Sequence, residues 1–194
     1  NRGFLMCLGG RRMEPGKDFL LLSLRKEPPS LLIYLIYMEQ TIELNAHNKA
    51  EFPPMHTAEH LLNQTMVRMF GCERSRNAHI ERKKSKISYH LPKEPSVEQV
   101  EQIVQKMNEL IQADLPVTYE YVQADEVPEG ISLDRLPEDA SELLRLVRIG
   151  DYDLCPCIGL HVASTRELVE FILLGTNWDA ERENFRIRFK LGVK

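Results

Sequence analysis

The segment PPMHTAEHLLNQTMVRMFG, residues 53–71, has the clearest helical pattern in the chain, and the rest of the fold can be worked out from it. The two prolines end any extended segment before them, and Gly71 suits the position just past a helix C-terminus. Between them, apolar residues recur at three- and four-residue intervals, the spacing of one buried helix face. These residues are Ala58, Leu61, Leu62, Met66, Met69 and Phe70. The pattern predicts a helix over residues 55–70.

Helix and strand patterns continue downstream. Residues 78–91 alternate and predict two strands around a basic turn. Ser96 and Gln99 form a capping box that begins a second helix, with an expected buried face of Val97, Val100, Ile103, Val104, Met107, Leu110 and Ile111. Strands are expected at 117–122, 146–149, 168–174 and 185–191, a loop at 128–137, a short helix near 138–144 and a turn at 175–179. This mixture predicts an α+β fold, with helices packed on one antiparallel sheet.

The composition is that of an ordinary globular protein, with 194 residues, 43% hydrophobic and 28% charged. It excludes collagen-like and wholly disordered chains. A net charge of −4 argues against a strongly basic nucleic-acid binder on totals alone. The charge is uneven, however, because residues 68–93 carry eight basic and two acidic side chains, whereas residues 94–144 carry two basic and thirteen acidic ones. We therefore expect a cationic surface beside an anionic one.

The N-terminal residues 1–37 differ from the rest of the chain. The apolar block at 31–38 is far shorter than the roughly 20 residues of a membrane-spanning helix, and no unbroken signal-peptide region precedes a cleavage site. Because the sequence from Met38 onward resembles a complete domain start, we interpret 1–37 as a non-native or disordered extension and 38–194 as the domain. Four cysteines are too few for a disulfide scaffold. Reduced thiols, a cytoplasmic location and no membrane contact are expected.

Two spaced pairs of metal-binding residue types lie far apart in the sequence. His56 and His60 are four residues apart, so on a helix they share one face and can meet one metal. Cys157 and His161 have the same spacing, and Gly159 between them favours a turn that lets thiolate and imidazole converge. Either pair alone is weak evidence, but together they offer a ligand set suited to Zn²⁺.

The spacing also excludes one class of zinc enzyme. Zincin-type metalloproteases carry Glu directly after the first His of this pair. Thr57 stands at that position here, and the only Glu of the motif, Glu59, precedes the second His. Glu59 therefore does not stand where a zincin base would, and a metalloprotease is not expected.

The motif HTAEHLL, followed far downstream by CIGLHVASTREL, resembles the editing domain of alanyl- and threonyl-tRNA synthetases and the free-standing AlaX-type trans-editing proteins. The resemblance covers about residues 45–175. It implies an α+β editing domain that hydrolyses the ester of a wrongly charged tRNA, serine or glycine on alanine tRNA or serine on threonine tRNA. It also implies that Zn²⁺ is held by His56, His60, Cys157 and His161.

The late cysteine motif departs from the family pattern. Threonine-type members have an acidic residue two positions before the ligand cysteine, and Cys155 stands there, while Asp153 lies two positions earlier still. The late ligand is therefore Cys155 or Cys157, and only Cys157 keeps the spacing to His161. Thr57 is a candidate to contact a substrate hydroxyl, and Asp153 a candidate to orient a water.

The basic turn is the expected contact for the acceptor end of tRNA, through Arg82, Lys83, Lys84 and Lys86. Phosphate contacts of this kind supply affinity that falls with salt. Two other functions remain open from the sequence. One is a non-catalytic, metal-stabilised module that binds tRNA or a synthetase, and the other is a metallohydrolase of small esters or amides.

Overall fold

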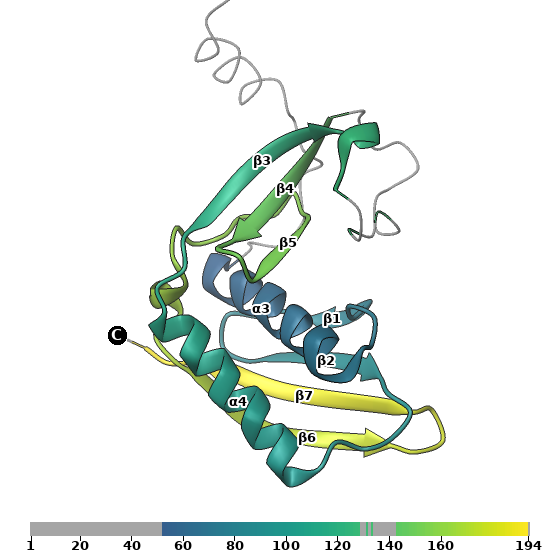
Figure 1. The fold of residues 1–194 in the computed structure, drawn as a ribbon. Coiled ribbons are helices and arrows are strands. Elements are labelled where there is room, and N and C mark those ends of the chain that lie inside the picture. Colours follow the sequence, from purple (N-terminus) through teal and green to yellow (C-terminus); the bar gives the residue numbers. More distant parts are fainter. Residues whose placement is uncertain (1–51, 129–130, 132, 134–142, 194) are drawn as a thin grey trace, which may run out of the picture. The chain divides into compact units, whose positions relative to one another are not determined.

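The computed structural model describes residues 52–128, 131, 133 and 143–193 (Figure 1). The expected boundary between residues 37 and 38 lies outside this range, as do most of the expected loop at 128–137 and the larger part of the expected short helix near 138–144. The last two residues of that helix, Leu143 and Leu144, instead begin a strand.

Two α-helices are described. α3 (Pro53–Phe70) begins with its prolines in the first turn, where the missing backbone N–H costs nothing, and ends at Gly71, which has a φ of 63°. α4 (Val97–Gln112) begins with both hydrogen bonds of the Ser96–Gln99 capping box. The helices expected at 55–70 and from Ser96 onward are confirmed, with α3 starting two residues earlier because both prolines are helical. No helix in the described part of the chain is long and apolar enough to cross a membrane.

The strands form two antiparallel sheets rather than the single sheet expected, although the α+β class is confirmed. One sheet has the order β1-β2-β7-β6, and its strands are β1 (Asn77–His79), β2 (Ser85–His90), β7 (Asn184–Leu191) and β6 (Phe171–Asp179). The other has the order β3-β4-β5, formed by β3 (Val117–Gln123), β4 (Leu143–Ile149) and β5 (Asp153–Pro156). Short 3₁₀ segments lie at η1 (Ala124–Glu126) and η2 (Thr165–Leu168).

The turn expected at residues 175–179 is wrong, because these residues belong to β6. The strand runs through these residues with an irregularity between Leu173 and Gly175, and the chain turns only after Asp179. Gly175 and Asn177 are turn-forming residue types, but pairing with β7 holds both in the sheet. The expected run at 168–174 is also corrected, because Leu168 ends η2 and the strand begins at Phe171.

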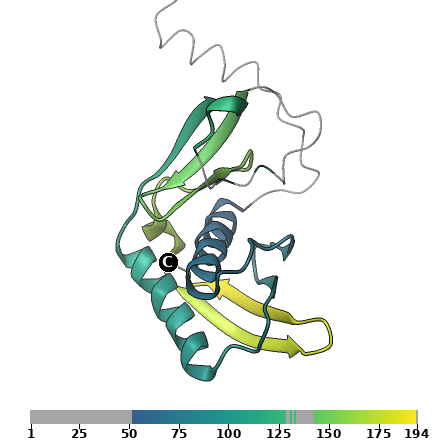
Figure 2. The ribbon, with the colours of Figure 1, turned by 45° about the vertical axis from the view of Figure 1, so that its right-hand side comes forward.

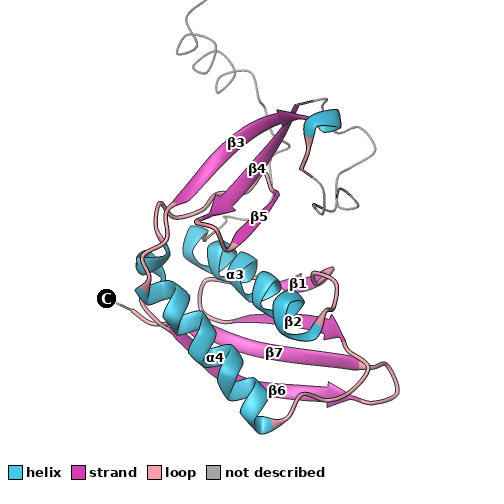
Figure 3. Cartoon of the chain, viewed as in Figure 1, coloured by secondary structure: helices cyan, strands magenta, loops and turns pink. Residues whose placement is uncertain are grey.

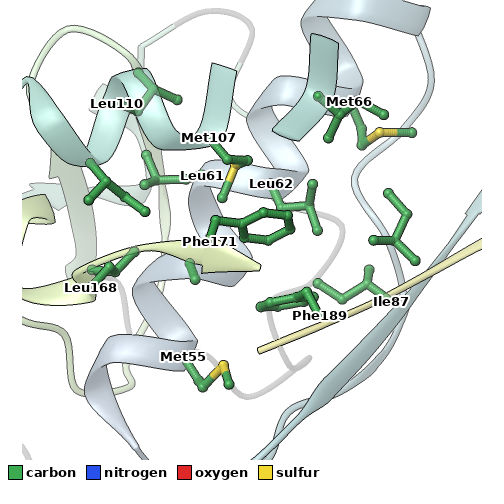
Figure 4. Close-up of a cluster of buried hydrophobic side chains, with 14 of the residues drawn as sticks. Met55, Leu61, Leu62, Met66, Ile87, Met107, Leu110, Leu168, Phe171 and Phe189 are labelled. Carbon is green, nitrogen blue, oxygen red and sulfur yellow. The ribbon is translucent and has the colours of Figure 1, made fainter. Parts of the chain in front are cut away.

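The core lies between the two helices and one face of the four-stranded sheet (Figures 1 and 3). Figure 2 shows the helices side by side on the same side of that sheet. In the close-up of Figure 4, side chains from α3 and α4 meet those of the strands, and the Phe171 and Phe189 rings stack with centroids 4.9 Å apart. Val97 was expected on the buried face of α4 but is 70% exposed. The buried face of this helix consists of Ile103, Met107, Leu110 and Ile111.

Candidate metal centre

Helix α3 presents its two histidines toward the segment that follows β5. His56 and His60 lie one turn apart, with ring centroids separated by 5.2 Å. The ring of His161 stacks on His56 at 4.3 Å and meets His60 edge-on at 4.5 Å. The fold thus brings the two imidazoles of α3 together with that of His161, which lies about a hundred residues further along the chain on a loop.

Four possible ligand atoms converge in this cluster. His56, His60, Cys157 and His161 each offer one atom, and these atoms all lie within 4.8 Å of one another. Cys157 Sγ is 3.5 Å from His56 Nε2 and 3.5 Å from His161 Nε2. A tetrahedral zinc with Zn–S of about 2.3 Å and Zn–N of about 2.0–2.1 Å requires ligand atoms roughly 3.5 Å apart. The donor set and these two separations therefore fit Zn²⁺.

Thr57 orients one of the imidazoles. Its hydroxyl is fully buried, donates to the Pro53 carbonyl at 3.0 Å and lies 3.1 Å from His161 Nδ1. It also accepts the Val162 backbone N–H at 3.3 Å. With its one proton given to Pro53, the hydroxyl accepts from Nδ1–H of His161, which leaves the Nε2 lone pair toward the cluster.

Asp153 holds a second imidazole and pairs with a buried arginine. Its Oδ2 lies 3.2 Å from His60 Nδ1, so the other ring nitrogen of His60 is left for the cluster. Arg74 binds both carboxylate oxygens, at 2.6 and 3.2 Å. The side chains of Asp153 and Arg74 are 1% and 17% exposed. Burial alone would raise the pKa of Asp153, but the hydrogen bond from His60 and the charge of Arg74 outweigh it and lower that pKa.

The imidazoles favour the thiolate form of Cys157. Burial alone would raise the pKa of this thiol, but hydrogen bonds from His161, His56 and His60 outweigh it and lower the pKa to about 2. Burial would lower the pKa of His56, yet contact with Cys157 raises it. Burial and the charges of His60 and His56 lower the pKa of His161 to about 4. The Cys157 thiolate and neutral His161 are in the state that zinc requires of its ligands, whereas His56 and His60, whose pKa values are raised, must release any bound proton before they bind it.

Arg145, on β4, holds the turn that carries Cys157. Its guanidinium donates to the Cys157 carbonyl at 2.8 Å and to the Gly159 carbonyl at 2.5 Å. The guanidinium centre also lies 4.8 Å from the ring centroid of Tyr119 on the neighbouring strand. The Gly159 backbone N–H points back to Cys157 Sγ at 3.4 Å. These contacts fix the position of the thiolate.

Cys155 contacts one of the two α3 imidazoles, that of His60. Its Sγ is 3.4 Å from His60 Nδ1, the nitrogen that also faces Asp153. Cys155, Asp153 and His60 form a second possible group of metal ligands, without His56 or His161. Of the two cysteines that the sequence left open, the geometry favours Cys157 as the partner of the three imidazoles.

The basic stretch 68–93 contains two kinds of cation, those exposed to solvent and those used inside the fold. Arg82, Lys83, Lys84 and Lys86 are all exposed, in the loop between β1 and β2 and at the start of β2. Two other basic residues of the stretch 68–93 are used inside the fold. Arg74 pairs with Asp153, and Arg68 donates to the Tyr152 carbonyl at 2.6 Å with its guanidinium over the Tyr152 ring.

Sequence reasoning missed Arg74 and Arg145 as parts of the site. Arg74 belongs to a basic stretch, and its partner Asp153 is 79 residues away. Arg145 occupies an ordinary strand position whose role depends on the turn that packs beside it. Neither Arg74 nor Arg145 lies at a regular sequence spacing from the His and Cys pairs, so no sequence pattern indicates their role.

This part of the chain is similar to known proteins. Residues 144–187, which include Cys157 and His161, match the family described as threonyl and alanyl tRNA synthetase second additional domain. Over 143 residues the chain is 32% identical to the alanyl-tRNA editing protein AlaX-L of Pyrococcus horikoshii, covering 72% of this chain and 34% of that protein. Alanine–tRNA ligases of Leptospira biflexa and Bacillus subtilis are 27% and 28% identical, over 68% and 66% of this chain.

On these matches, the chain is related to the threonyl- and alanyl-tRNA synthetase second additional domain family, whose model matches residues 144–187. Its helices and antiparallel sheets agree with the editing-domain fold expected from the sequence. The matched region spans 34% of the length of the Pyrococcus protein. It spans only 14% and 15% of the lengths of the Leptospira and Bacillus ligases.

Proposed function

We propose that this chain is a zinc-dependent aminoacyl-tRNA deacylase that removes a wrong amino acid from tRNA. The observation that carries the proposal is the convergence of His56, His60, Cys157 and His161 in a chain related to an alanyl-tRNA editing protein. Because the relatives are alanine-specific in name, we favour seryl- or glycyl-tRNA for alanine as the substrate, with seryl-tRNA for threonine as the second choice.

The reaction is hydrolysis of an ester, in which water is consumed and the amino acid leaves the ribose of the tRNA 3′ end. Zinc bound to the four ligands would supply a Lewis acid that polarises the ester carbonyl or makes water more acidic. Four protein ligands close a tetrahedral site, whereas catalytic zinc keeps a position open. A catalytic zinc here would therefore need either an expanded coordination sphere or only three of the four residues as its ligands.

Thr57 and Asp153 act in this proposal by orienting imidazoles. Thr57 has no exposed surface, and its hydroxyl is engaged by Pro53, His161 and Val162. Asp153 is buried between His60 and Arg74. A carboxylate that accepts a hydrogen bond from a metal-binding imidazole holds that ring in one tautomer and direction. The substrate-hydroxyl contact expected of Thr57 and the water contact expected of Asp153 stay predictions.

The tRNA acceptor end is the proposed macromolecular partner. Arg82, Lys83, Lys84 and Lys86 are exposed cations available to its phosphates. The cytoplasmic location expected from the sequence stays a prediction.

The test is a panel of charged tRNAs incubated with the purified full chain, with zinc content measured in the same preparation. We expect one zinc per chain and release of serine or glycine from alanine tRNA, while correctly charged alanyl-tRNA is left intact. His56→Ala is expected to lose zinc and to lower the deacylation rate by roughly 100-fold or more, because a ligand is removed. His90→Ala, at an exposed histidine paired with Glu183, is the matched control and should keep both.

Other results would select a different function. Binding of tRNA with no release of any amino acid would indicate a non-catalytic module. Hydrolysis of small esters or amides but not of charged tRNA would indicate another metallohydrolase. Full deacylation by His56→Ala after loss of zinc would contradict the metal mechanism.

A further inference from the structure

A cavity of about 490 Å³ lies at the basic turn, away from the metal centre's ligands. Lys84 and Lys86 line it from the loop and from β2, and Arg188 lines it from β7. His79, Glu81 and Leu174 complete most of its wall. Arg188 comes from the far C-terminal strand, so the sequence pattern of the turn gave no indication of it.

Three of these residues stand in one row across the sheet. His79 on β1 pairs with Lys86 on β2, and Lys86 pairs with Arg188 on β7. Two like charges placed directly opposite each other on neighbouring strands destabilise a sheet. An anion bound between Lys86 and Arg188 would offset their repulsion and stabilise this part of the sheet.

The cations of the cavity have no carboxylate partners within the described residues. No ion pair joins Lys84, Lys86 or Arg188 to an acidic side chain there. Glu81 is the acidic residue of the wall, and its carboxylate is 2.6 Å from His79 Nε2. The local charge therefore remains strongly positive, which matches a polyanion rather than a neutral ligand.

Gly175 completes the row and makes room for Arg188. It pairs with Arg188 next to the strand irregularity, and its φ is 143°. A Cβ atom at this position would lie 3.1 Å from Nη2 of Arg188. The absence of a side chain on β6 thus lets the guanidinium lie across the strand at the cavity.

Two side-chain contacts join the basic loop to the start of α3. The guanidinium centre of Arg82 lies 5.0 Å from the Phe52 ring centroid, directly before α3. Ser85, which also lines the cavity, contacts Met55 Sδ at 3.5 Å. Met55 precedes His56, so the loop connects the cavity to the helix that carries the candidate ligands.

We propose that this cavity is a binding site for a backbone phosphate of RNA, with Lys84, Lys86 and Arg188 as its donors. The inference rests on the proposed function in naming tRNA as the RNA. It extends the expected contact from the basic turn to the C-terminal strand. Lys and Arg side chains are common donors to the phosphate oxygens of a nucleic-acid backbone.

The test is the binding of uncharged tRNA to the full chain over a series of salt concentrations. The double variant Lys86→Gln, Arg188→Gln should bind roughly 10-fold more weakly at low salt, and the slope of log affinity against log salt should become shallower by about 1, as loss of one phosphate contact predicts. The matched control is Lys93→Gln, Arg182→Gln, which removes the same charge from exposed sites outside the cavity. The control should retain the wild-type slope.

A second variant keeps the inference testable if the double variant folds poorly. Leu174→Glu places a carboxylate at an exposed position of the cavity wall without removing a cation, and it should also weaken binding. Wild-type affinity in the folded variants, or an equal loss in the control, would overturn the inference.

Charged tRNA separates this inference from the proposed function. If the wild type deacylates charged tRNA and the cavity variants bind tRNA with unchanged affinity, the phosphate site is overturned. The proposed deacylase function is then still supported. Cavity-dependent binding without release of any amino acid supports the site and contradicts the deacylase.

Discussion

Asp153 is a single buried carboxylate shared by the His60 imidazole and the Arg74 guanidinium. Asp153→Asn leaves the Arg74 guanidinium buried without its counter-charge. We expect the free energy of unfolding to fall by about 3 kcal/mol, the cost typical of breaking a buried ion pair on one side. Zinc affinity should fall about 10-fold, because His60 loses the group that orients it. Urea denaturation and competition with a chelator measure the two effects.

The control for this variant is Glu120→Gln on the three-stranded sheet. Glu120 pairs with Arg148, but the two side chains are 38% and 37% exposed. Removal of such an exposed pair should cost about 0.5 kcal/mol and leave zinc affinity unchanged. Equal losses in the two variants would show that Asp153 has no special role.

At the scale of elements, only part of the apolar face of α4 is buried in the core. Ile103 is 2% exposed and faces the buried cluster, whereas Val97 begins the helix and is 70% exposed. Ile103→Ala should lower the free energy of unfolding by about 3 kcal/mol through lost burial and a cavity. Val97→Ala should change it by less than about 0.5 kcal/mol. Thermal or urea unfolding of both variants tests this, and a comparable cost for Val97 would contradict the packing described here.

The same elements show why local patterns predict some features and miss others. The Ser96–Gln99 capping box is confirmed because its groups lie within one helical turn. The periodicity of α4 indicates which side is buried, but the extent of the sheet beneath decides where burial stops. Gly175 was expected in a turn, yet its pairing with Arg188 on β7 keeps it in a strand. Pairing between strands is not visible in either strand alone.

At the scale of the whole domain, the candidate metal centre joins α3 to the segment after β5. A metal that binds only the folded chain raises its free energy of unfolding, and the increase grows with the logarithm of the ratio of free metal concentration to Kd. At a free metal concentration of 1,000 times Kd, the increase is about 4 kcal/mol. Removing zinc with a chelator should therefore lower Tm in the wild type. His56→Ala should have a low Tm that the chelator does not change. An unchanged wild-type Tm after confirmed removal of zinc would contradict a stabilising metal centre.

The sequence by itself predicted the two helices, the Ser96–Gln99 capping box, the α+β class and the spacing of the two His/Cys pairs, because each follows from residue patterns within single segments of the chain. Tertiary structure decided which cysteine faces the three imidazoles, that Arg74 and Arg145 support the site, and that the strands divide into two sheets. It also placed Arg188 beside Lys86. These features join segments many tens of residues apart, and their contacts follow from the packing of the core and the pairing of strands rather than from any local spacing.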